Sequence, residues 1–297
     1  MLGNIDENNL AAYISETFTL NPKFSINTGV RYDYFHDQYL DKLNGNSLDN
    51  ASASIVSPKL SFFYHLNDKA QLYLNAGRGF HSNDTRVVVP QNSLKVLPAA
   101  YGSDLGTVVK PSKNILVNAA VWYLWLDQEF VYVGDEGSVE PSGKSERYGA
   151  DLSIRYQPVS WLYADVDLNY SHGRAVDEPK GANYLPLAPH FTSIGGLTVK
   201  TKPGINTSLR YRYMGDRPAN EDNSVIAKGY FVTDASLNYQ KKKYEIGFFI
   251  QNLFNVKWKE TQFDTESRLQ NEATPVSEIH FTPGTPFSAK FSFTYLF

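Results

Sequence analysis

The chain has 297 residues, with 28 Lys and Arg against 31 Asp and Glu, and its formal net charge of -3 indicates no surface for nucleic acid. It contains no cysteine, which excludes a disulfide framework, a thiolate metal site and a cysteine nucleophile. Tyr and Phe are abundant, at 20 and 18 residues, yet no run reaches the roughly 20 consecutive apolar residues of a transmembrane helix. The absence of such a run excludes helical membrane proteins. It does not exclude membrane β-barrels, because only every second residue of a barrel strand has to be apolar.

Alternation of apolar and polar residues begins near the N-terminus, where a first strand is predicted around residues 10–20. It recurs down to the last residue, Phe297, on which the segment FSAKFSFTYLF ends. A period of two is typical of a strand with one apolar and one polar face, and we count about thirteen such segments and no helical period longer than two turns. The clearest segments are residues 24–34, 148–156, 162–170, 208–213 and 287–297.

The connections between these segments alternate between two kinds. Tight-turn compositions occur at residues 21–22, 67–69, 157–158, 202–204 and 241–243. Long polar connections are predicted at residues 38–53, 81–112, 134–146, 172–189, 215–229 and 258–286. Since every second connection of an up-and-down meander lies at the same end, all tight turns are expected at one end of the sheet and all long loops at the other.

This ordering predicts an all-β fold, an antiparallel transmembrane β-barrel segment of about thirteen strands. Strands in hydrocarbon must close because an open sheet edge cannot lie there. A soluble sandwich or propeller has a polar outer face, whereas this chain repeats Tyr, Phe, Leu and Val on one face. Candidates for the aromatic girdles at the membrane interfaces are Phe24, Tyr34, Tyr156, Trp161, Tyr170, Tyr213, Tyr239, Tyr244 and Phe297.

The strand count is odd, whereas single-chain bacterial barrels are usually even. The first strand then runs in the same direction as the last, which places residues 1–8 in an outer loop. We therefore expect the chain to be the C-terminal part of a longer protein.

Several motifs, taken together and in order, resemble the barrel of TonB-dependent outer-membrane receptors over nearly the whole chain. One departure is Ser112, which stands where the family usually has Glu after Lys-Pro. The matching pieces are a Gly-x-Arg-Tyr-Asp strand (Gly29, Arg31, Tyr32, Asp33), a Pro-Lys-Leu hairpin ending in Gly-x-Gly-Phe (Pro58 to Phe80), Lys110-Pro111, Asn-Leu-Phe (Asn252, Leu253, Phe254), Pro283-Gly284 and the terminal Phe297.

The resemblance implies that the thirteen strands are the C-terminal part of a 22-stranded barrel in the outer membrane of a Gram-negative bacterium. It implies an N-terminal plug domain and a TonB box, neither of which we find in residues 1–297. The implied function is TonB-energised uptake of a scarce nutrient, first an iron–siderophore chelate, otherwise cobalamin, another metal chelate or a glycan. The implied partners are outer-membrane lipid, the TonB complex through the missing N-terminal part, the barrel-assembly machinery and the extracellular nutrient. No cofactor and no covalent chemistry are implied.

Candidate site residues fall into three groups. The loop residues His81, Asn83, Asp84, Arg86 and His172 are candidates for contact with the nutrient, against the simpler interpretation of a solvated loop base. Tyr295 and Phe297 resemble the C-terminal signal for barrel assembly. Polar-face residues are expected to face the lumen, where they line a substrate path or hydrogen-bond one another and the plug: Arg31, Asp33, Asp151, Arg155, Asp165, Asp167, Arg210 and Arg212.

Two other functions are possible for an outer-membrane barrel: passive diffusion and catalysis. A passive porin-like channel is the alternative transport function. An outer-membrane enzyme needs a Ser, His and Asp cluster near the rim, and no such motif is found, so no catalytic residue is predicted. The six histidines show no metal-ligand spacing, so no metal site is predicted either.

Overall fold

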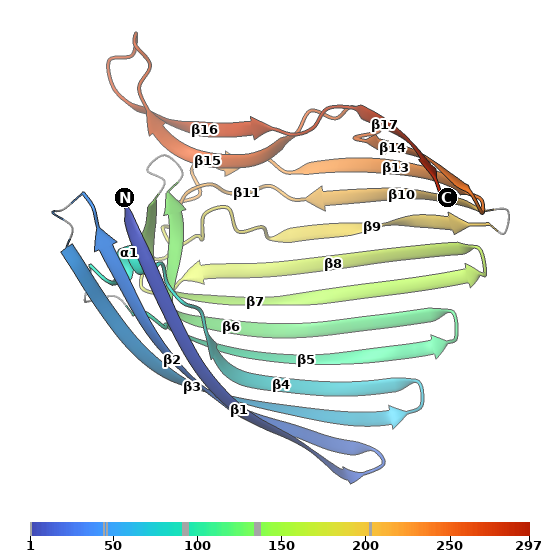
Figure 1. Ribbon diagram of the computed structural model, residues 1–297, viewed down its shortest axis with the longest axis horizontal. Coiled ribbons are helices and arrows are strands. Elements are labelled where there is room, and N and C mark those ends of the chain that lie inside the picture. Colours follow the sequence, from blue (N-terminus) through green and yellow to red (C-terminus); the bar gives the residue numbers. More distant parts are fainter. Residues whose placement is uncertain (1, 44, 46, 91–94, 134–137, 202–203) are drawn as a thin grey trace. The chain divides into compact units, whose positions relative to one another are not determined.

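The computed structural model describes residues 2–43, 45, 47–90, 95–133, 138–201 and 204–297. It confirms the all-β prediction, because the chain forms a thirteen-stranded antiparallel sheet in which sequence neighbours pair from β1 to β10, followed by β13, β14 and β17 (Figure 1). No helix among the described residues has the length and apolarity to cross a membrane.

The sheet strands are β1 (Gly3–Asn21), β2 (Phe24–Asp41), β3 (Ser47–Asn67), β4 (Ala70–Phe80), β5 (Ala99–Ser112), β6 (Ile115–Val133), β7 (Ser138–Val159), β8 (Leu162–Ala175), β9 (Phe191–Lys200), β10 (Ile205–Met214), β13 (Tyr230–Gln240), β14 (Tyr244–Gln251) and β17 (Ser288–Tyr295). The long connections contain α1 (Thr85–Val88), the short pair β11 (Arg217–Pro218) and β12 (Ile226–Ala227), and the hairpin of β15 (Lys259–Ser267) and β16 (Val276–Pro283).

The chain divides into two compact units. The first comprises Met1–Gly106, Trp122–Tyr148 and Arg174–Pro179, and the second comprises Thr107–Val121, Gly149–Gly173 and Lys180–Phe297. In the second unit tight turns and long connections alternate along the chain, as predicted, whereas in the first unit β2 ends at Asp41 and β3 already begins at Ser47.

Asparagine side chains stabilise the tight turns of the first unit. The Asn21 Oδ1 atom accepts hydrogen bonds from the backbone N–H groups of Lys23 (2.9 Å) and Phe24 (3.0 Å). The Asn67 Oδ1 atom accepts one from the N–H of Lys69 at 2.8 Å. These contacts replace backbone partners that a two-residue turn leaves unpaired, which is why Asn recurs there.

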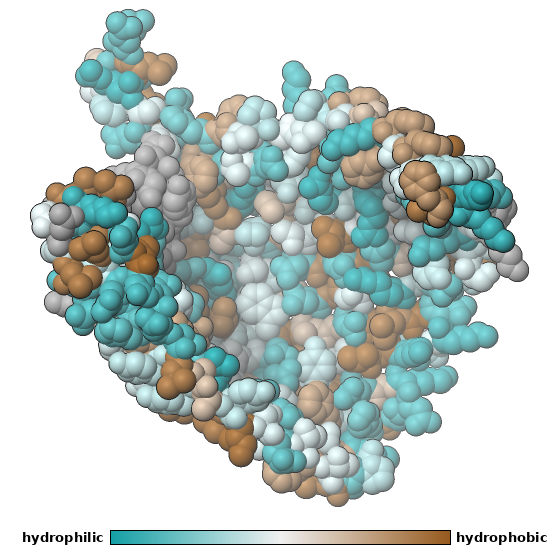
Figure 2. All heavy atoms as spheres, viewed as in Figure 1, coloured by the Kyte–Doolittle hydropathy of each residue, from teal (hydrophilic) through white to brown (hydrophobic). Residues whose placement is uncertain are grey.

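Strand register separates an apolar from a polar face. In the first unit Val30 lies opposite Ile14 on β1 and Pro58 on β3. In the second unit the alternation of the last strand is confirmed, since Phe291 and Phe293 lie opposite Phe248 and Ile246 of β14. Phe291 is 70% exposed, and hydrophobic residues gather over this strand at the upper right of Figure 2. Large apolar side chains that are exposed on strand after strand suit a lipid environment.

Several predicted loop boundaries are wrong because strands continue into the polar segments. β1 begins at Gly3 rather than after residue 8. The 38–53 connection shrinks because β2 runs to Asp41 and β3 begins at Ser47, and the 81–112 connection ends where β5 begins at Ala99. The 134–146 connection loses its second part to β7, while residues 134–137 lie outside the described residues. Backbone ladders satisfy N–H and C=O groups whatever the side chains are, so strands with two polar faces give no alternation signal.

One predicted turn is also displaced. Residues 157–158 belong to β7, and the turn falls at Ser160 and Trp161. The backbone N–H of Gln157 still donates to the carbonyl of Asn114 at 2.8 Å, so the ladder continues past the expected turn. Of the predicted 202–204 turn, residues 202–203 lie outside the described residues.

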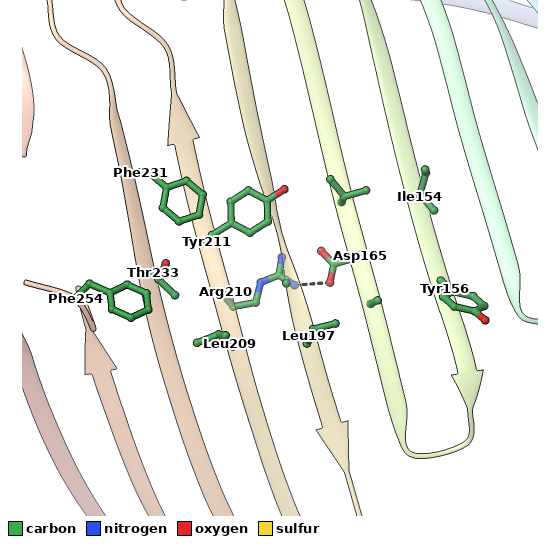
Figure 3. Close-up of a pocket in the computed structure, with 13 residues that line it drawn as sticks. Ile154, Tyr156, Asp165, Leu197, Leu209, Arg210, Tyr211, Phe231, Thr233 and Phe254 are labelled. Carbon is green, nitrogen blue, oxygen red and sulfur yellow. Dashed lines mark hydrogen bonds and ion pairs between the residues drawn. The ribbon is translucent and has the colours of Figure 1, made fainter. Parts of the chain in front are cut away.

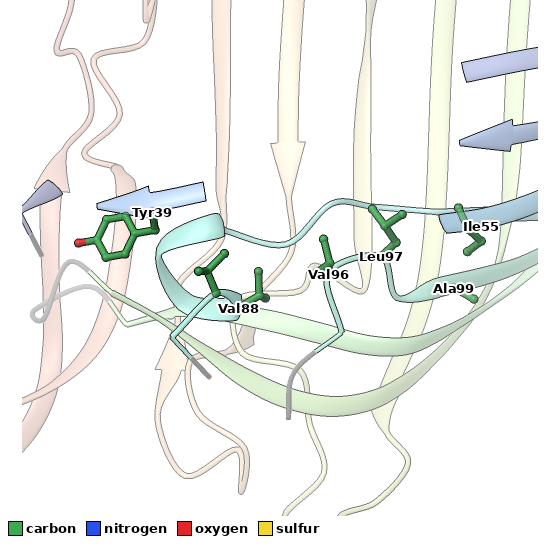
Figure 4. Close-up of a cluster of buried hydrophobic side chains, with 7 residues drawn as sticks. Tyr39, Ile55, Val88, Val96, Leu97 and Ala99 are labelled. Atoms are coloured by element: carbon green, nitrogen blue, oxygen red, sulfur yellow. The ribbon is translucent and has the colours of Figure 1, made fainter. Parts of the chain in front are cut away.

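A hydrophobic cluster lies where the connection between β4 and β5 folds back onto β2 and β3 (Figure 4). Val88, Val96 and Leu97 of this connection pack with Tyr39 of β2 and Ile55 of β3. Ile55 is the register partner of Asp33, so the cluster covers the face that carries the charged residues. The described residues of this connection, 81–90 and 95–98, are therefore packed on the polar face rather than forming a solvated loop.

Candidate functional site

The charged residues of the second unit form a ladder of ion pairs along the polar face. The guanidinium of Arg155 donates two hydrogen bonds to Asp167, from Nη1 at 2.8 Å and from Nη2 at 2.9 Å. Arg212 pairs with Asp234 at 3.6 Å between Nη2 and Oδ2. These two pairs each join neighbouring strands, β7 to β8 and β10 to β13.

The middle pair of the ladder, Asp165 and Arg210, spans two strand spacings (Figure 3). Asp165 on β8 and Arg210 on β10 are both register partners of Gly196 on the intervening β9. A Cβ atom at Gly196 would lie 3.0 Å from the Arg210 Cδ atom and 2.1 Å from the Leu209 carbonyl oxygen. The missing side chain thus gives Arg210 its path across β9.

Seven of the eight residues predicted to face the lumen lie in hydrogen-bonded pairs, and the eighth, Arg212, lies in its ion pair with Asp234. Arg31 donates from Nη2 to the Oδ1 atom of Asp33 at 2.8 Å, and Asp33 is only 1% exposed. Asp151 accepts a hydrogen bond from the Asn169 side chain. The sequence reasoning missed the partners Asn169 and Asp234, although both stand at polar positions of alternating strands. That these pairs face a lumen stays a prediction.

A basic cavity of about 460 Å³ lies in the first unit. Arg31, Lys59 and Arg78 line it, and a second cavity of about 530 Å³ shares Lys59 and Arg78. The Ser57 Oγ atom and the Arg78 Nε atom are buried without a hydrogen-bond partner in the described part of the chain. Unpaired donors and cationic side chains suit an anionic group. Lys59 and Arg78 belong to motifs noted in the sequence, but their cationic role was missed.

A third hollow, of about 580 Å³, lies in the second unit (Figure 3). Its lining includes Tyr156, Leu197, Tyr211 and Phe231. Leu197 is the register partner of Ala164 and Leu209, which places this hollow on the apolar face. An apolar groove on that face suits an acyl chain rather than a water-soluble nutrient.

Three predicted loop residues stabilise the 81–98 segment itself. Asn83 is 6% exposed, and its Nδ2 atom donates to the carbonyl of Lys95 at 2.6 Å and to Gln128 at 3.2 Å. Asp84 caps α1 by accepting from the N–H of Arg86 at 2.9 Å, and it also forms an ion pair with that side chain. Hydrogen bonding to Arg86 lowers the pKa of Asp84, in spite of partial burial. A nutrient contact through Asn83 would require this segment to open.

His81 and His172 are half-buried. The His172 ring lies 5.9 Å from the ring of His190, centroid to centroid, and the sequence reasoning missed His190. The His190 Nδ1 atom lies 3.1 Å from the carbonyl oxygen of Ser171. No group of three or more His, Cys, Asp or Glu side chains able to hold a metal ion occurs among the described residues.

The acidic connection at residues 215–229 uses its carboxylates internally. Asp216 accepts from the N–H of Gly229 at 2.7 Å and from Lys228 at 2.9 Å. These bonds, the backbone one first, lower the pKa of Asp216. Gln262 of β15 is 1% exposed and bonds both backbone groups of Lys228, at 2.9 Å and 2.8 Å. The β15–β16 hairpin is thus attached to this connection.

Asn252 of the Asn-Leu-Phe motif anchors the connection between β14 and β17. It is 1% exposed and has a φ of 50°, in the left-handed region. Its Nδ2 atom donates to the carbonyls of Val256 (2.8 Å) and Thr285 (3.0 Å), and its Oδ1 atom accepts from the Val256 N–H at 2.8 Å. Asn255 adds a bond from the N–H of Phe287 at 3.0 Å. The motif therefore fixes the chain where it enters the last strand.

The last residues carry the predicted assembly signal. Tyr295 lies opposite Tyr244 at the end of β17, and its ring meets the ring of Phe297 edge to face at 5.4 Å. Both side chains are exposed. Their role in assembly stays a prediction.

An antiparallel sheet with an aromatic apolar face, a polar face of paired charges and alternating turn lengths defines an outer-membrane β-barrel protein. Residues 2–253 match the family model described as "TonB dependent receptor-like, beta-barrel", and the chain belongs to this family. The family consists of transport receptors, and its members lie in the outer membrane of Gram-negative bacteria, which is where this chain is placed.

Curated relatives include the pesticin receptor of Yersinia enterocolitica, 23% identical over 269 residues that cover 84% of this chain and 39% of that protein. The catecholate siderophore receptor Fiu of Escherichia coli K12 is 22% identical over 289 residues, covering 84% and 38%. The chain thus spans about two fifths of the length of these relatives.

Solved structures show the same fold. The ferric yersiniabactin uptake receptor FyuA from Yersinia pestis has a TM-score of 0.76 at 20% identity, covering 99% of this chain and 46% of that one. The ferric citrate transporter FecA in its unliganded form also has a TM-score of 0.76, at 15% identity, covering 97% and 44%.

Proposed function

We propose that this chain is the C-terminal barrel portion of a receptor that takes up an iron–siderophore chelate across the outer membrane. The observation that carries the proposal is the family match over residues 2–253. The siderophore class is supported by the names of the similar proteins, which include receptors for catecholate siderophores, ferrioxamine and ferric yersiniabactin. Cobalamin, another metal chelate or a glycan are the remaining nutrients to compare. The proposed activity is transport without covalent chemistry.

The whole protein is proposed to hold a plug domain and a TonB box ahead of this barrel portion, and 22 barrel strands in all. The relatives are more than twice as long as their matched regions, which supports a longer protein. Within the described sheet β1 and β17 each have one neighbouring strand. A free edge cannot lie in hydrocarbon, so further strands are needed to close the barrel.

The polar-face pairs are proposed to serve the lumen and the plug. Their carboxylates and guanidinium groups are already paired with one another, as in the Arg155–Asp167 and Asp165–Arg210 pairs. His81, Asp84, Arg86 and His172 are proposed as contacts of the nutrient. Asn83 is proposed to act with them only when the 81–98 segment opens.

The direct test is uptake of radioactive iron as ferric siderophores by cells that lack endogenous siderophores. The full gene should restore uptake of one siderophore class, and deletion of the TonB gene should abolish it. Uptake that persists without TonB would support the passive porin-like channel instead. Restored growth on cobalamin or a glycan, without any iron uptake, would overturn the siderophore assignment.

Tyr295 and Phe297 are proposed to be recognised by the barrel-assembly machinery, and the apolar face to contact outer-membrane lipid. Deletion of Phe297 should lower the amount of folded, heat-modifiable receptor in the outer membrane. Substitution of the polar-face residue Lys290, on the same strand, is the control and should leave that amount unchanged.

A further inference from the structure

Two carboxylates face each other where the 81–98 segment covers the first two strands. Glu7 on β1 and Asp37 on β2 are direct register partners in the antiparallel ladder. Side chains of directly opposite residues lie on the same face with Cβ atoms roughly 4.5–5.5 Å apart, and like charges in this position destabilise a sheet. The repulsion is relieved by a bound cation or by protonation of one of the two carboxylates.

The burial of Asp37 adds a second cost. Asp37 is 2% exposed, and its Oδ1 atom has no hydrogen-bond partner in the described part of the chain. A buried carboxylate oxygen without a partner is costly. None of the ion pairs among the described residues includes Glu7 or Asp37.

The neighbouring charged groups are engaged elsewhere. Arg86 of the covering segment forms its ion pair with Asp84. His36 precedes Asp37 on the strand and so points to the opposite face, where its Nδ1 atom lies 2.8 Å from the Ser52 Oγ atom. Neither Arg86 nor His36 forms an ion pair with the two carboxylates.

A third oxygen ligand comes from α1. Thr85 is 1% exposed, and its hydroxyl donates to the Glu7 Oε1 atom. Two carboxylates and a hydroxyl give an all-oxygen set without imidazole or thiolate, which suits a hard cation. Calcium accepts irregular sets of this kind and completes its six to eight ligands with water, whereas magnesium demands near-ideal octahedral geometry.

We propose that Glu7, Asp37 and Thr85 form a calcium site that fastens the 81–98 segment to β1 and β2. The cation neutralises the opposed carboxylates and ties α1 to the strands through the Thr85 hydroxyl. With two carboxylates the affinity should fall in the range of extracellular calcium modules, with a Kd of roughly 10⁻⁴ to 10⁻³ M. The expected extracellular position rests on the proposed function, but calcium binding itself does not.

The test uses the purified full-length receptor in detergent at pH 7.5. Trypsin cleavage after Lys95, whose side chain is 58% exposed, reports opening of the segment. Calcium at ten times its Kd should slow this cleavage about tenfold relative to EDTA, since opening competes with binding. Cleavage that is independent of calcium up to 10 mM would overturn the proposal, as would a response to magnesium but not to calcium.

Matched variants separate a calcium site from a merely acidic contact. Asp37→Asn and Glu7→Gln should lose the calcium response, and in EDTA both should be cleaved more slowly than the wild type because the repulsion is gone. Asp84→Asn, in the same segment, should keep the tenfold response. Loss of the response in Asp84→Asn, or its persistence in Asp37→Asn, would overturn the assignment.

Terbium luminescence provides a second readout that does not depend on protease access. Tyr39, two residues beyond Asp37 on the same face and 3% exposed, should sensitise bound terbium. Emission that calcium displaces should be lost in Asp37→Asn and reduced in Tyr39→Phe. Failure of siderophore uptake with this signal intact would refute the proposed function and leave the calcium site standing.

Discussion

Asn252 should contribute more to the connection between β14 and β17 than any exposed residue of that segment. Replacing it with Ala removes three side-chain hydrogen bonds, with the Val256 N–H and with the carbonyls of Val256 and Thr285. Each bond contributes about 1 kcal/mol net, so their loss costs about 3 kcal/mol. The φ of 50° adds about 1 kcal/mol, because Ala is strained in the left-handed region. The connection should therefore open about 4 kcal/mol more easily.

Two further substitutions separate these contributions. Asn252→Gly keeps the left-handed backbone without strain and loses only the hydrogen bonds, which predicts about 3 kcal/mol. Asn252→Asp keeps the acceptor for the Val256 N–H but turns a buried carboxylate oxygen toward the carbonyls of Val256 and Thr285, so it should be at least as damaging as Asn252→Ala. Of the two uncharged variants, Ala should be more damaging than Gly.

Hydrogen exchange of the full-length receptor in detergent measures this opening at amides that do not bond Asn252. The N–H of Gly284 donates to the carbonyl of Trp258 at 2.9 Å, and the N–H of Phe287 donates to Asn255 at 3.0 Å. Their exchange should be faster by roughly a thousandfold in Asn252→Ala and by roughly a hundredfold in Asn252→Gly, at 1.4 kcal/mol per factor of ten. Unchanged exchange at both amides, or equal acceleration by Ala and Gly, would refute the reasoning.

Three other outcomes are expected. Gly196→Ala should destabilise the receptor by about 1–3 kcal/mol in denaturant unfolding, because its Cβ would overlap the Leu209 carbonyl. The control Gly79→Ala should change stability little, because nothing lies within 4 Å of its Cβ. Equal effects of the two substitutions would contradict the crossing of Arg210 over β9. A double-mutant cycle of Asp165→Asn and Arg210→Gln should give a coupling energy of up to about 1 kcal/mol, as for partly exposed ion pairs. A coupling energy of zero would show that Asp165 and Arg210 do not stabilise one another. The pKa of Asp216 is below its ordinary value of 3.8. Its contribution to stability is therefore present above pH 3.8 and is lost as pH falls through the lower folded-state pKa. Hydrogen exchange of the Gly229 amide, corrected for its intrinsic rate, should be constant from pH 8 to 5 and faster in Asp216→Asn throughout.

The strand pattern is the part of the structure that the sequence predicts best. Residues of β17 such as Phe291 and Phe293 alternate because one face meets lipid, and that constraint is visible in every second position. The ends of the strands are predicted poorly. Asp6, Glu7, Asn8 and Asn9 follow one another, so both faces of β1 are polar there, and nothing in a single sequence shows that the backbone of these residues remains paired.

The site is predicted in part, for a similar reason. Alternation places Arg155, Asp165 and Arg210 on one face, but pairing depends on register, which turn lengths alone do not determine. The Asp165–Arg210 pair also depends on Gly196, whose absent side chain carries no signal of its own. The packing of Val88 and Val89 was missed because α1 is a single turn, Thr85–Val88, which is too short for a helical period to appear in the sequence.

The β15–β16 hairpin is attached near its base, through Gln262 and through the contacts of Asn252 and Trp258. Its ladder ends at Ser267 and Val276, so the residues between them contribute little to the attachment. Substitutions, insertions and deletions between residues 267 and 276 should therefore leave the attachment of the hairpin and the pairing of the thirteen sheet strands unchanged.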